Sequence, residues 1–373
     1  MKVIYISSAS LPNSFANSYQ TVKTCEALKR AGVDIELWAE SKGDERAILR
    51  SYGLESSDLF NFLRNGKKRL NHVFYSIAVL RKLRSQDKKT FVLYSRETGM
   101  WIVLLFAKYI WNVPFVFEVH RKESIKWHDA LRRKLLLKKA DGLVVISKAL
   151  FESFKNDKKN IGLAFCGVEP KRFQNIISKT DSLLKYKLLE DKIYLGYAGG
   201  FEEYQGLKTL VKAFNILYKN NSRLGLFIAG GKTGEIESIK AYFTKEALGG
   251  VYFLGMLPFA DVPGALAAAD ILVMPFENID QGGSPVKMFE YLFMSRPIVS
   301  SRTPMIEEVL RDNENALLFS AGNFEELAEK ISLLLSDLEL IKRLASQSFI
   351  ERNLYTFDNR AKTIKVVIEQ AVR

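Results

Sequence analysis

A short stretch of the chain, QGGSPVKMFEYL (residues 281–292), combines a loop, a helix start, a cation and a carboxylate. Gly282 and Gly283 would let the backbone come close to a ligand. Ser284 is a favoured helix N-cap and Pro285 is favoured in a first helical turn, so we predict that a helix starts here. Its free N–H groups and its dipole would suit a phosphate.

Lys287 and Glu290 are three residues apart and would share one face of this helix. Lys287 could add positive charge to a phosphate site, and Glu290 could accept hydrogen bonds from two neighbouring sugar hydroxyls. The same spacing is typical of an ion pair on the surface of a capped helix. The spacing alone leaves both interpretations open.

Two other groups follow predicted strands directly. Gly199 and Gly200 begin a loop that contains Gln205, at the kind of strand end where open α/β sheets bind ligands. His120 follows the predicted strand Phe115–Val119. This histidine could hydrogen-bond a substrate hydroxyl or could satisfy backbone groups in the core.

The elements that would position these residues are short apolar strands alternating with amphipathic helices. The predicted strands are Val3–Ser7, Asp34–Ala39, Phe91–Tyr94, Phe115–Val119, Leu143–Ile146, Ile193–Ala198, Leu224–Ala229, Val251–Phe253 and Ile271–Met274. The alternation predicts parallel sheets covered by helices. It is interrupted between residues 167 and 191, and the chain has 373 residues, so we predict two α/β domains.

The most apolar segment, Met100–Phe117, is interrupted by Lys108, Asn112 and Pro114. A membrane-spanning helix needs about twenty apolar residues, so we expect a buried helix followed by a buried strand. The first residues, MKVIYIS, lack the apolar core of a signal peptide. With only two distant cysteines, the chain is expected in a reducing compartment, the cytoplasm.

The formal net charge of +13 comes mainly from residues 1–165, where cations outnumber anions almost two to one. The densest part, residues 64–89, could meet anionic lipid, a polyanionic substrate or nucleic acid, or could be a solvated surface. The apolar residues at helical spacing beside these cations are Phe74, Ile77, Leu80 and Leu83. They could enter a membrane interface or face the core.

An ordered series of segments resembles family 4 of the glycosyltransferases, which have the GT-B fold. The segments are MKVIYIS, ALKRAGVDIELWA, FVFEVH, ADGLVVIS, GVEPKRF, GYAGGFEEYQGLKTLVKAF, LFIAGG, VYFLGMLP, ALAAADILVMPF and SPVKMFEYLFMSRPIVSS. The resemblance implies two Rossmann-like domains facing across a cleft, with residues 1–168 on the acceptor side and residues 190–356 binding a nucleotide sugar. A final helix of about residues 357–373, apolar on one face, is expected to pack on the first domain.

The resemblance also implies retaining transfer of a sugar from a nucleotide diphosphate sugar to a glycan or lipid-linked glycan, in bacterial-type surface polysaccharide synthesis. His120 matches the histidine that contacts the donor sugar, and Glu290 matches a glutamate that holds the ribose. The donor-binding residues are then expected to be Gly199, Gly200, Gln205, Gly282, Gly283, Ser284, Pro285, Val286 and Glu290. His120 and Lys287 are the expected catalytic residues. A lipid-linked acceptor would place the basic half on the inner leaflet of the cell membrane.

Three positions depart from the family pattern. Gly282 stands where a glutamate is expected, Gly200 where an arginine is expected, and Gln205 where a lysine is expected. Two cations that hold the diphosphate are therefore missing, and Lys287 is hypothesised to supply part of their charge. No Asp-x-Asp triplet occurs, so neither a metal nor a separate cofactor is expected.

Other functions stay open at this point. The lost cations and glutamate are compatible with a catalytically weak or inactive nucleotide-sugar-binding or scaffold protein of the same fold. A nucleotide-sugar epimerase shares that fold and would need no acceptor. A nucleic-acid binder would explain the basic half, but no nucleic-acid motif is present, so no nucleic-acid partner is expected.

Overall fold

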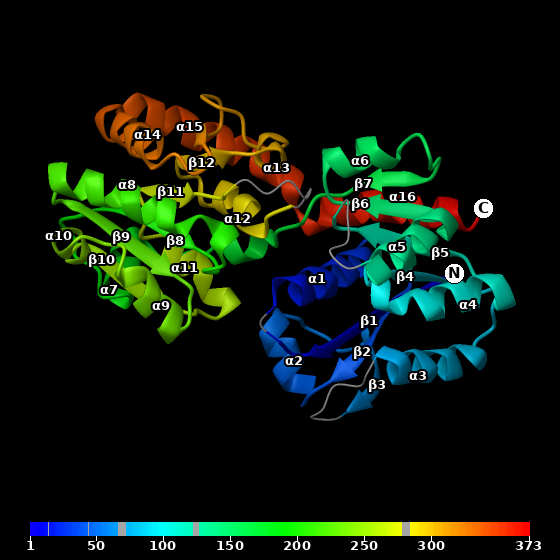
Figure 1. The fold of residues 1–373 in the computed structure, drawn as a ribbon. Coiled ribbons are helices and arrows are strands. Elements are labelled where there is room, and N and C mark those ends of the chain that lie inside the picture. Colours follow the sequence, from blue (N-terminus) through cyan, green and yellow to red (C-terminus); the bar gives the residue numbers. More distant parts are fainter. Residues whose placement is uncertain (14, 44, 66–71, 122–126, 278–283) are drawn as a thin grey trace. The chain divides into compact units, whose positions relative to one another are not determined.

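The computed structural model describes residues 1–13, 15–43, 45–65, 72–121, 127–277 and 284–373. The chain forms two compact units, which are described separately (Figure 1). Unit 1 consists of residues 1–167, 281–284 and 356–373, and unit 2 consists of residues 168–280 and 285–355.

Unit 1 is built on a parallel sheet of seven strands in the order β3-β2-β1-β4-β5-β6-β7. The strands are β1 Lys2–Leu11, β2 Ile35–Ser41, β3 Phe60–Asn65, β4 Phe91–Ser95, β5 Phe115–Val119, β6 Gly142–Val145 and β7 Ile161–Leu163. β4 and β5 are buried along their whole length, as expected for a parallel sheet covered on both faces. The strand order reverses between β1 and β4, so their carboxyl ends flank a crevice.

Helices cover both faces of this sheet. They are α1 Ala16–Arg30, α2 Glu45–Tyr52, α3 His72–Arg84, α4 Trp101–Trp111, α5 Trp127–Lys139, α6 Lys148–Phe154 and α16 Phe357–Ala371, with a 3-10 turn η1 Thr98–Met100. α16, the last helix of the chain, packs on α1 and on β6 and β7 (Figure 1). Its buried face includes Ala361, Ile364 and Ile368, whereas Ala371 is half-buried.

Unit 2 contains a parallel sheet of six strands in the order β10-β9-β8-β11-β12-β13. The strands are β8 Ile193–Ala198, β9 Leu224–Ala229, β10 Val251–Gly255, β11 Ile271–Met274, β12 Ile298–Arg302 and β13 Leu317–Ser320. The helices are α7 Lys179–Lys185, α8 Leu207–Asn220, α9 Thr233–Lys240, α10 Lys245–Leu248, α11 Val262–Leu266, α12 Val286–Met294, α13 Pro304–Glu307, α14 Phe324–Ser336 and α15 Leu338–Glu351. Two short 3-10 turns, η2 Pro170–Phe173 and η3 Glu203–Gln205, precede α7 and α8.

The two parallel sheets confirm the predicted fold class. The apolar segment Met100–Phe117 forms α4 and then β5, separated by Asn112 in the left-handed conformation. In the described part of the chain, no helix is both long and apolar enough to cross a membrane.

Candidate functional site

The helix predicted near Ser284 starts one residue later than expected. α12 begins at Val286, because Pro285 is its N-cap and has an extended backbone with ψ of 116°. The Ser284 hydroxyl does not cap the helix and instead accepts a hydrogen bond from the backbone N–H of Cys166 at 3.4 Å. The prediction of a serine cap was therefore wrong, and the first turn of α12 carries no side-chain cap.

Lys287 lies in the first turn of α12 and is half-buried. Its Nζ donates to Gln205 Oε1 at 2.6 Å and to the Tyr197 hydroxyl at 3.3 Å. The same atom lies over the rings of Tyr197 and Phe276, 4.4 and 4.8 Å from their centroids. Desolvation lowers the pKa of Lys287 to about 7, although nearby carboxylates oppose this shift.

The glycine turn after β8 makes room for this amine. A Cβ on Gly199 would lie 2.3 Å from Lys287 Nζ, so only glycine fits here without displacing the lysine. The carbonyl of Gly200 accepts a hydrogen bond from the Tyr197 hydroxyl at 2.7 Å. The fold thus brings Gly199, Gly200, Gln205 and Lys287 together at the carboxyl end of β8.

Glu290 is buried on the next turn of α12 and forms an ion pair with Arg172, not with Lys287. Arg172 Nη1 donates to Glu290 Oε1 at 2.7 Å, and its Nη2 donates to the backbone carbonyl of Phe259 at 2.6 Å. Its guanidinium also lies 3.9 Å from the centroid of the Phe259 ring. The alternative of a surface pair between Lys287 and Glu290 is therefore wrong.

His120 lies in unit 1, directly after β5, and both of its ring nitrogens have side-chain partners. Nδ1 lies 3.0 Å from Arg96 Nη2, and Nε2 is hydrogen-bonded to Glu118 Oε1. Desolvation and the Arg96 guanidinium lower the pKa of His120 to about 4. The imidazole is thus neutral at pH 7, and we assign Nε2–H as the donor to Glu118 and Nδ1 as the acceptor from Arg96.

Glu118 is the buried centre of this network. Its carboxylate also accepts from the Tyr94 hydroxyl and from Arg360 Nη2, which is 2.6 Å away on α16. Burial raises the pKa of Glu118, but the Arg360 guanidinium and His120 hold it well below the usual range. The partners of His120 are therefore charged side chains and not the backbone groups of the core interpretation.

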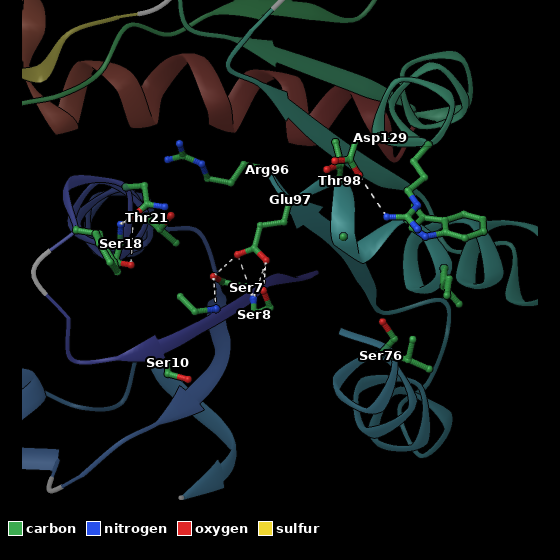
Figure 2. Close-up of a pocket in the computed structure, with 18 of the residues that line it drawn as sticks. Ser7, Ser8, Ser10, Ser18, Thr21, Ser76, Arg96, Glu97, Thr98 and Asp129 are labelled. Carbon is green, nitrogen blue, oxygen red and sulfur yellow. Dashed lines mark hydrogen bonds and ion pairs between the residues drawn. The ribbon is translucent and has the colours of Figure 1, made fainter. Parts of the chain in front are cut away.

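A cavity of about 830 Å³ opens in unit 1 where β1 and β4 end (Figure 2). Hydroxyl-bearing residues form much of its wall: Ser7, Ser8, Ser10, Ser18, Thr21, Ser76 and Thr98. The charged side chains that line it are Lys42, Arg96, Glu97, Asp129 and Arg132. Such a wall offers many groups that can donate and accept hydrogen bonds, which suits a polyhydroxylated ligand.

Glu97, which follows β4, is hydrogen-bonded to the second half of β1 in the wall of this cavity. Its carboxylate accepts from the hydroxyls of Ser7 and Ser8, at 2.6 and 2.5 Å, and from the Ser8 N–H at 3.0 Å (Figure 2). Asp129 is likewise engaged, because Arg132 Nη1 lies 3.3 Å from it. Both carboxylates of the wall therefore have protein partners.

Part of the chain is similar in sequence to known glycosyltransferases. Residues 192–337 match the model of the family "Glycosyl transferases group 1". The chain is 27% identical over 252 residues to the uncharacterized glycosyltransferase MJ1069 of Methanocaldococcus jannaschii. That match covers 66% of this chain and 62% of the relative, which is less than two thirds of the relative's length.

Solved structures agree along the whole chain. HepE of Anabaena, in complex with UDP and glucose, superposes with a TM-score of 0.78 at 16% identity and covers 99% of both chains. Sucrose-phosphate synthase of Thermosynechococcus elongatus gives a TM-score of 0.79 at 16% identity, over 99% of this chain and 98% of that one. The whole chain therefore has the GT-B fold, and residues 192–337 resemble a family of glycosyltransferases.

Several residues of the candidate sites were not found from the sequence. Arg172 is 118 residues from Glu290, and no spacing connects the two. Arg96 and Glu97 follow a predicted strand, but they belong to no recognisable motif. The one sequence signal for the cavity was the group of serines in the second half of β1. Gly282 and Gly283 lie outside the described residues.

Among the residues that the structure describes, no group of three or more His, Cys, Asp or Glu side chains could hold a metal ion.

Proposed function

We propose that this protein is a retaining glycosyltransferase of the family 4 type. It moves a sugar from a nucleotide diphosphate sugar to a glycan or lipid-linked glycan, in the synthesis of a surface polysaccharide. The observation that carries the proposal is the position of Lys287 Nζ, between the uncapped first turn of α12 and the glycine turn after β8. HepE of Anabaena, which has the same fold, has been solved with UDP and with UDP-glucose, and this supports a nucleotide-sugar donor.

The Lys287 amine restores a cation where the family pattern has lost one. Gln205 stands at the position of a family lysine, and Lys287 Nζ lies 2.6 Å from its side-chain oxygen. A lysine on α12 therefore reaches the same turn that the missing lysine would have occupied. This relocation favours a working donor site over an inactive scaffold.

The rest of the donor site follows from the same helix. Arg172 holds the Glu290 carboxylate in a fixed, buried position from which it can accept hydrogen bonds from ribose hydroxyls. The backbone N–H groups of the first turn and the positive end of the dipole would face the diphosphate. We assign Gly200 a role in donor binding only through its backbone. The side chain nearest to it is the Glu202 carboxylate, whose negative charge would not attract a diphosphate.

In the proposed reaction the bond between the anomeric carbon and the diphosphate oxygen breaks, and a bond to an acceptor oxygen forms on the same face. The leaving diphosphate takes the acceptor proton, so no protein general base is required. Lys287 and the start of α12 stabilise the charge that develops on the diphosphate, an effect of preorganised electrostatics. His120, which is neutral at pH 7, hydrogen-bonds the donor sugar and does not transfer a proton.

The acceptor is assigned to the cavity of unit 1, and exposed apolar residues of the same unit support a lipid-linked acceptor. α4 packs between α3 and α5 (Figure 1). The large apolar residues exposed on these three helices are Val73, Phe74, Ile77, Phe106, Tyr109, Ile110, Trp127 and Leu131. On α3, Phe74 and Ile77 are exposed and available to an interface, whereas Leu80 is half-buried and Leu83 faces the core. This surface suits peripheral attachment to the inner leaflet of the cell membrane.

Incubation with a panel of radiolabelled nucleotide sugars and lipid-linked glycan acceptors tests the proposal. We expect a UDP-sugar to raise Tm, as a ligand of the folded state must, and to donate its sugar with the anomeric configuration kept. Conversion of the sugar without an acceptor would instead identify an epimerase. Binding without transfer or hydrolysis across the panel would identify a scaffold protein.

A further inference from the structure

The imidazole of His120 has one nitrogen that is permanently engaged. Nε2–H donates to Glu118, whose carboxylate is also held by Tyr94 and by Arg360. Glu118 and Arg360 are 2% and 5% exposed, so this side of the ring is closed to a substrate. Any hydrogen bond from the ring to a substrate must therefore use Nδ1.

Nδ1 is occupied by Arg96 in this structure, because Arg96 Nη2 lies 3.0 Å from it. A neutral imidazole has one unprotonated nitrogen, and here that nitrogen accepts from the guanidinium. While Arg96 keeps this position, the histidine offers no polar ring atom to a donor sugar.

Arg96 also lines the cavity of unit 1 (Figure 2). The two carboxylates in the wall do not hold it, since Glu97 accepts from Ser7 and Ser8 and Asp129 accepts from Arg132. Its described hydrogen-bond partner is the uncharged ring of His120, and the buried Glu118 carboxylate attracts it at longer range. An oxyanion in the cavity would be a stronger partner, because it adds an opposite charge and can accept two parallel hydrogen bonds from the guanidinium.

We propose that Arg96 couples occupancy of the cavity to the availability of His120. An acceptor with an oxyanion, either a phosphate or a sugar carboxylate, binds in the cavity and draws the Arg96 guanidinium away from the imidazole. Nδ1 then becomes free to accept a hydrogen bond from a hydroxyl of the donor sugar. This coupling rests on the proposed function, and it ties sugar transfer to the presence of an anionic acceptor, so that the donor is not lost to water.

The coupling can be observed directly by NMR, because the chain has only three histidines. Protein labelled with ¹⁵N-histidine is titrated with inorganic phosphate, with glucuronate, and with glucose as the neutral control. The His120 signals are assigned by their loss in His120→Gln. We expect either anion to move the Nδ1 resonance downfield, as loss of a donated hydrogen bond requires, while Nε2 stays unchanged and glucose has no effect. The relative potency of the two anions tells a phosphate-bearing acceptor from a uronate.

Two arginine variants separate coupling from simple anion binding. In Arg96→Gln, we expect Nδ1 to resonate near its anion-bound position from the start and to respond no further. Arg132→Gln removes the other cavity arginine, which does not contact His120. It should weaken anion binding by about tenfold, yet at saturation it should give the same Nδ1 shift as the wild type.

A matching activity readout uses the ratio of donor hydrolysis to transfer. In Arg96→Gln, the ratio of donor hydrolysis without acceptor to sugar transfer with acceptor should rise by about tenfold. The reason is that Nδ1 of His120 can always accept a hydrogen bond from the donor sugar in this variant. The proposal is overturned if neither anion binds, if anions bind without moving Nδ1, or if Nδ1 responds equally in Arg96→Gln. The NMR experiment contains no nucleotide sugar, so its outcome does not depend on whether the chain is an active transferase.

Discussion

Lys287 shows how much the surroundings of one residue determine its chemistry. The aromatic rings around it desolvate the ammonium, and its pKa falls to about 7. The cation is therefore present below this pH and is lost as the pH rises through it. The diphosphate of a nucleotide sugar keeps a constant charge in the same range, so the lysine alone should make donor binding pH-dependent.

We predict that donor affinity falls as the pH rises through about 7 in the wild type. Lys287→Met should weaken binding by about tenfold at lower pH, because it removes one charge-assisted hydrogen bond, and should flatten the pH profile. Calorimetric titration with UDP-glucose across this range measures both effects. Lys287→Arg serves as the control, since it keeps a cation whose charge does not titrate. An unchanged Kd in Lys287→Met would remove the lysine from the donor site.

At the scale of residues, the sequence suggests ligands but does not reveal the contacts. The types and spacing of Lys287 and Glu290 are enough to suggest a phosphate and a sugar as ligands. Their partners, Gln205 and Arg172, are 82 and 118 residues away, and no local pattern encodes such distances. The predicted serine cap is absent because Pro285, expected in the first helical turn, has an extended ψ and is itself the N-cap. The helix therefore starts one residue later than predicted.

At the scale of elements, one buried ion pair joins the last helix to the centre of the first sheet. Arg360 on α16 contacts Glu118 at the end of β5 and also donates to Thr24 on α1 and to the carbonyls of Ala164 and Phe165. This single guanidinium thus connects four segments of unit 1. An exposed pair, Arg30 with Asp358, joins α1 to the same helix at 2.8 Å.

We predict very different costs for these two pairs. Arg360→Gln should destabilise the protein by about 3–5 kcal/mol, because it leaves a buried carboxylate without its cation. Arg30→Gln should cost about 1 kcal/mol or less, as is usual for exposed pairs. Unfolding in urea at pH 7 compares them. Adding Glu118→Gln to Arg360→Gln should recover part of the loss, and equal costs for the two single variants would refute a structural role for the buried pair.

Periodicity located most buried strands well, but it missed β12, which is buried between β11 and β13, and it missed the edge strands β3, β7 and β13. β4, β5, β8, β9 and β11 are runs of apolar residues that the pattern locates within one or two positions. β7 has three residues, too few for a period to be recognised, and β3 lies at the edge of its sheet. The pattern also ended β1 at Ser7, whereas the strand continues to Leu11 and carries the serines of the cavity.

At the scale of the whole molecule, the excess positive charge lies on the same unit as the exposed apolar residues of three neighbouring helices, α3, α4 and α5. Residues 1–165 carry most of the excess positive charge. The exposed apolar residues of α3, α4 and α5 belong to this unit, and the cations Arg81, Arg84, Lys134 and Lys138 are exposed or half-buried on α3 and α5. Composition revealed the charge, but only the fold shows which apolar side chains on these helices face outward.

We predict that the protein floats with vesicles containing anionic lipid, that it binds neutral vesicles weakly, and that salt reduces its binding. Phe74→Ser with Trp127→Ser should reduce flotation by about tenfold or more, because each ring gives up apolar burial in the interface. The matched control is Leu184→Ser with Leu354→Ser, which removes two apolar residues of unit 2 that are 64% and 65% exposed. Equal loss in both double variants would indicate nonspecific adhesion, and no flotation of the wild type would exclude this surface as a membrane contact. Selective loss in the first variant would show that unit 1 is the unit that meets the lipid. The cavity proposed for the acceptor belongs to this unit, so a lipid-linked glycan would be within its reach.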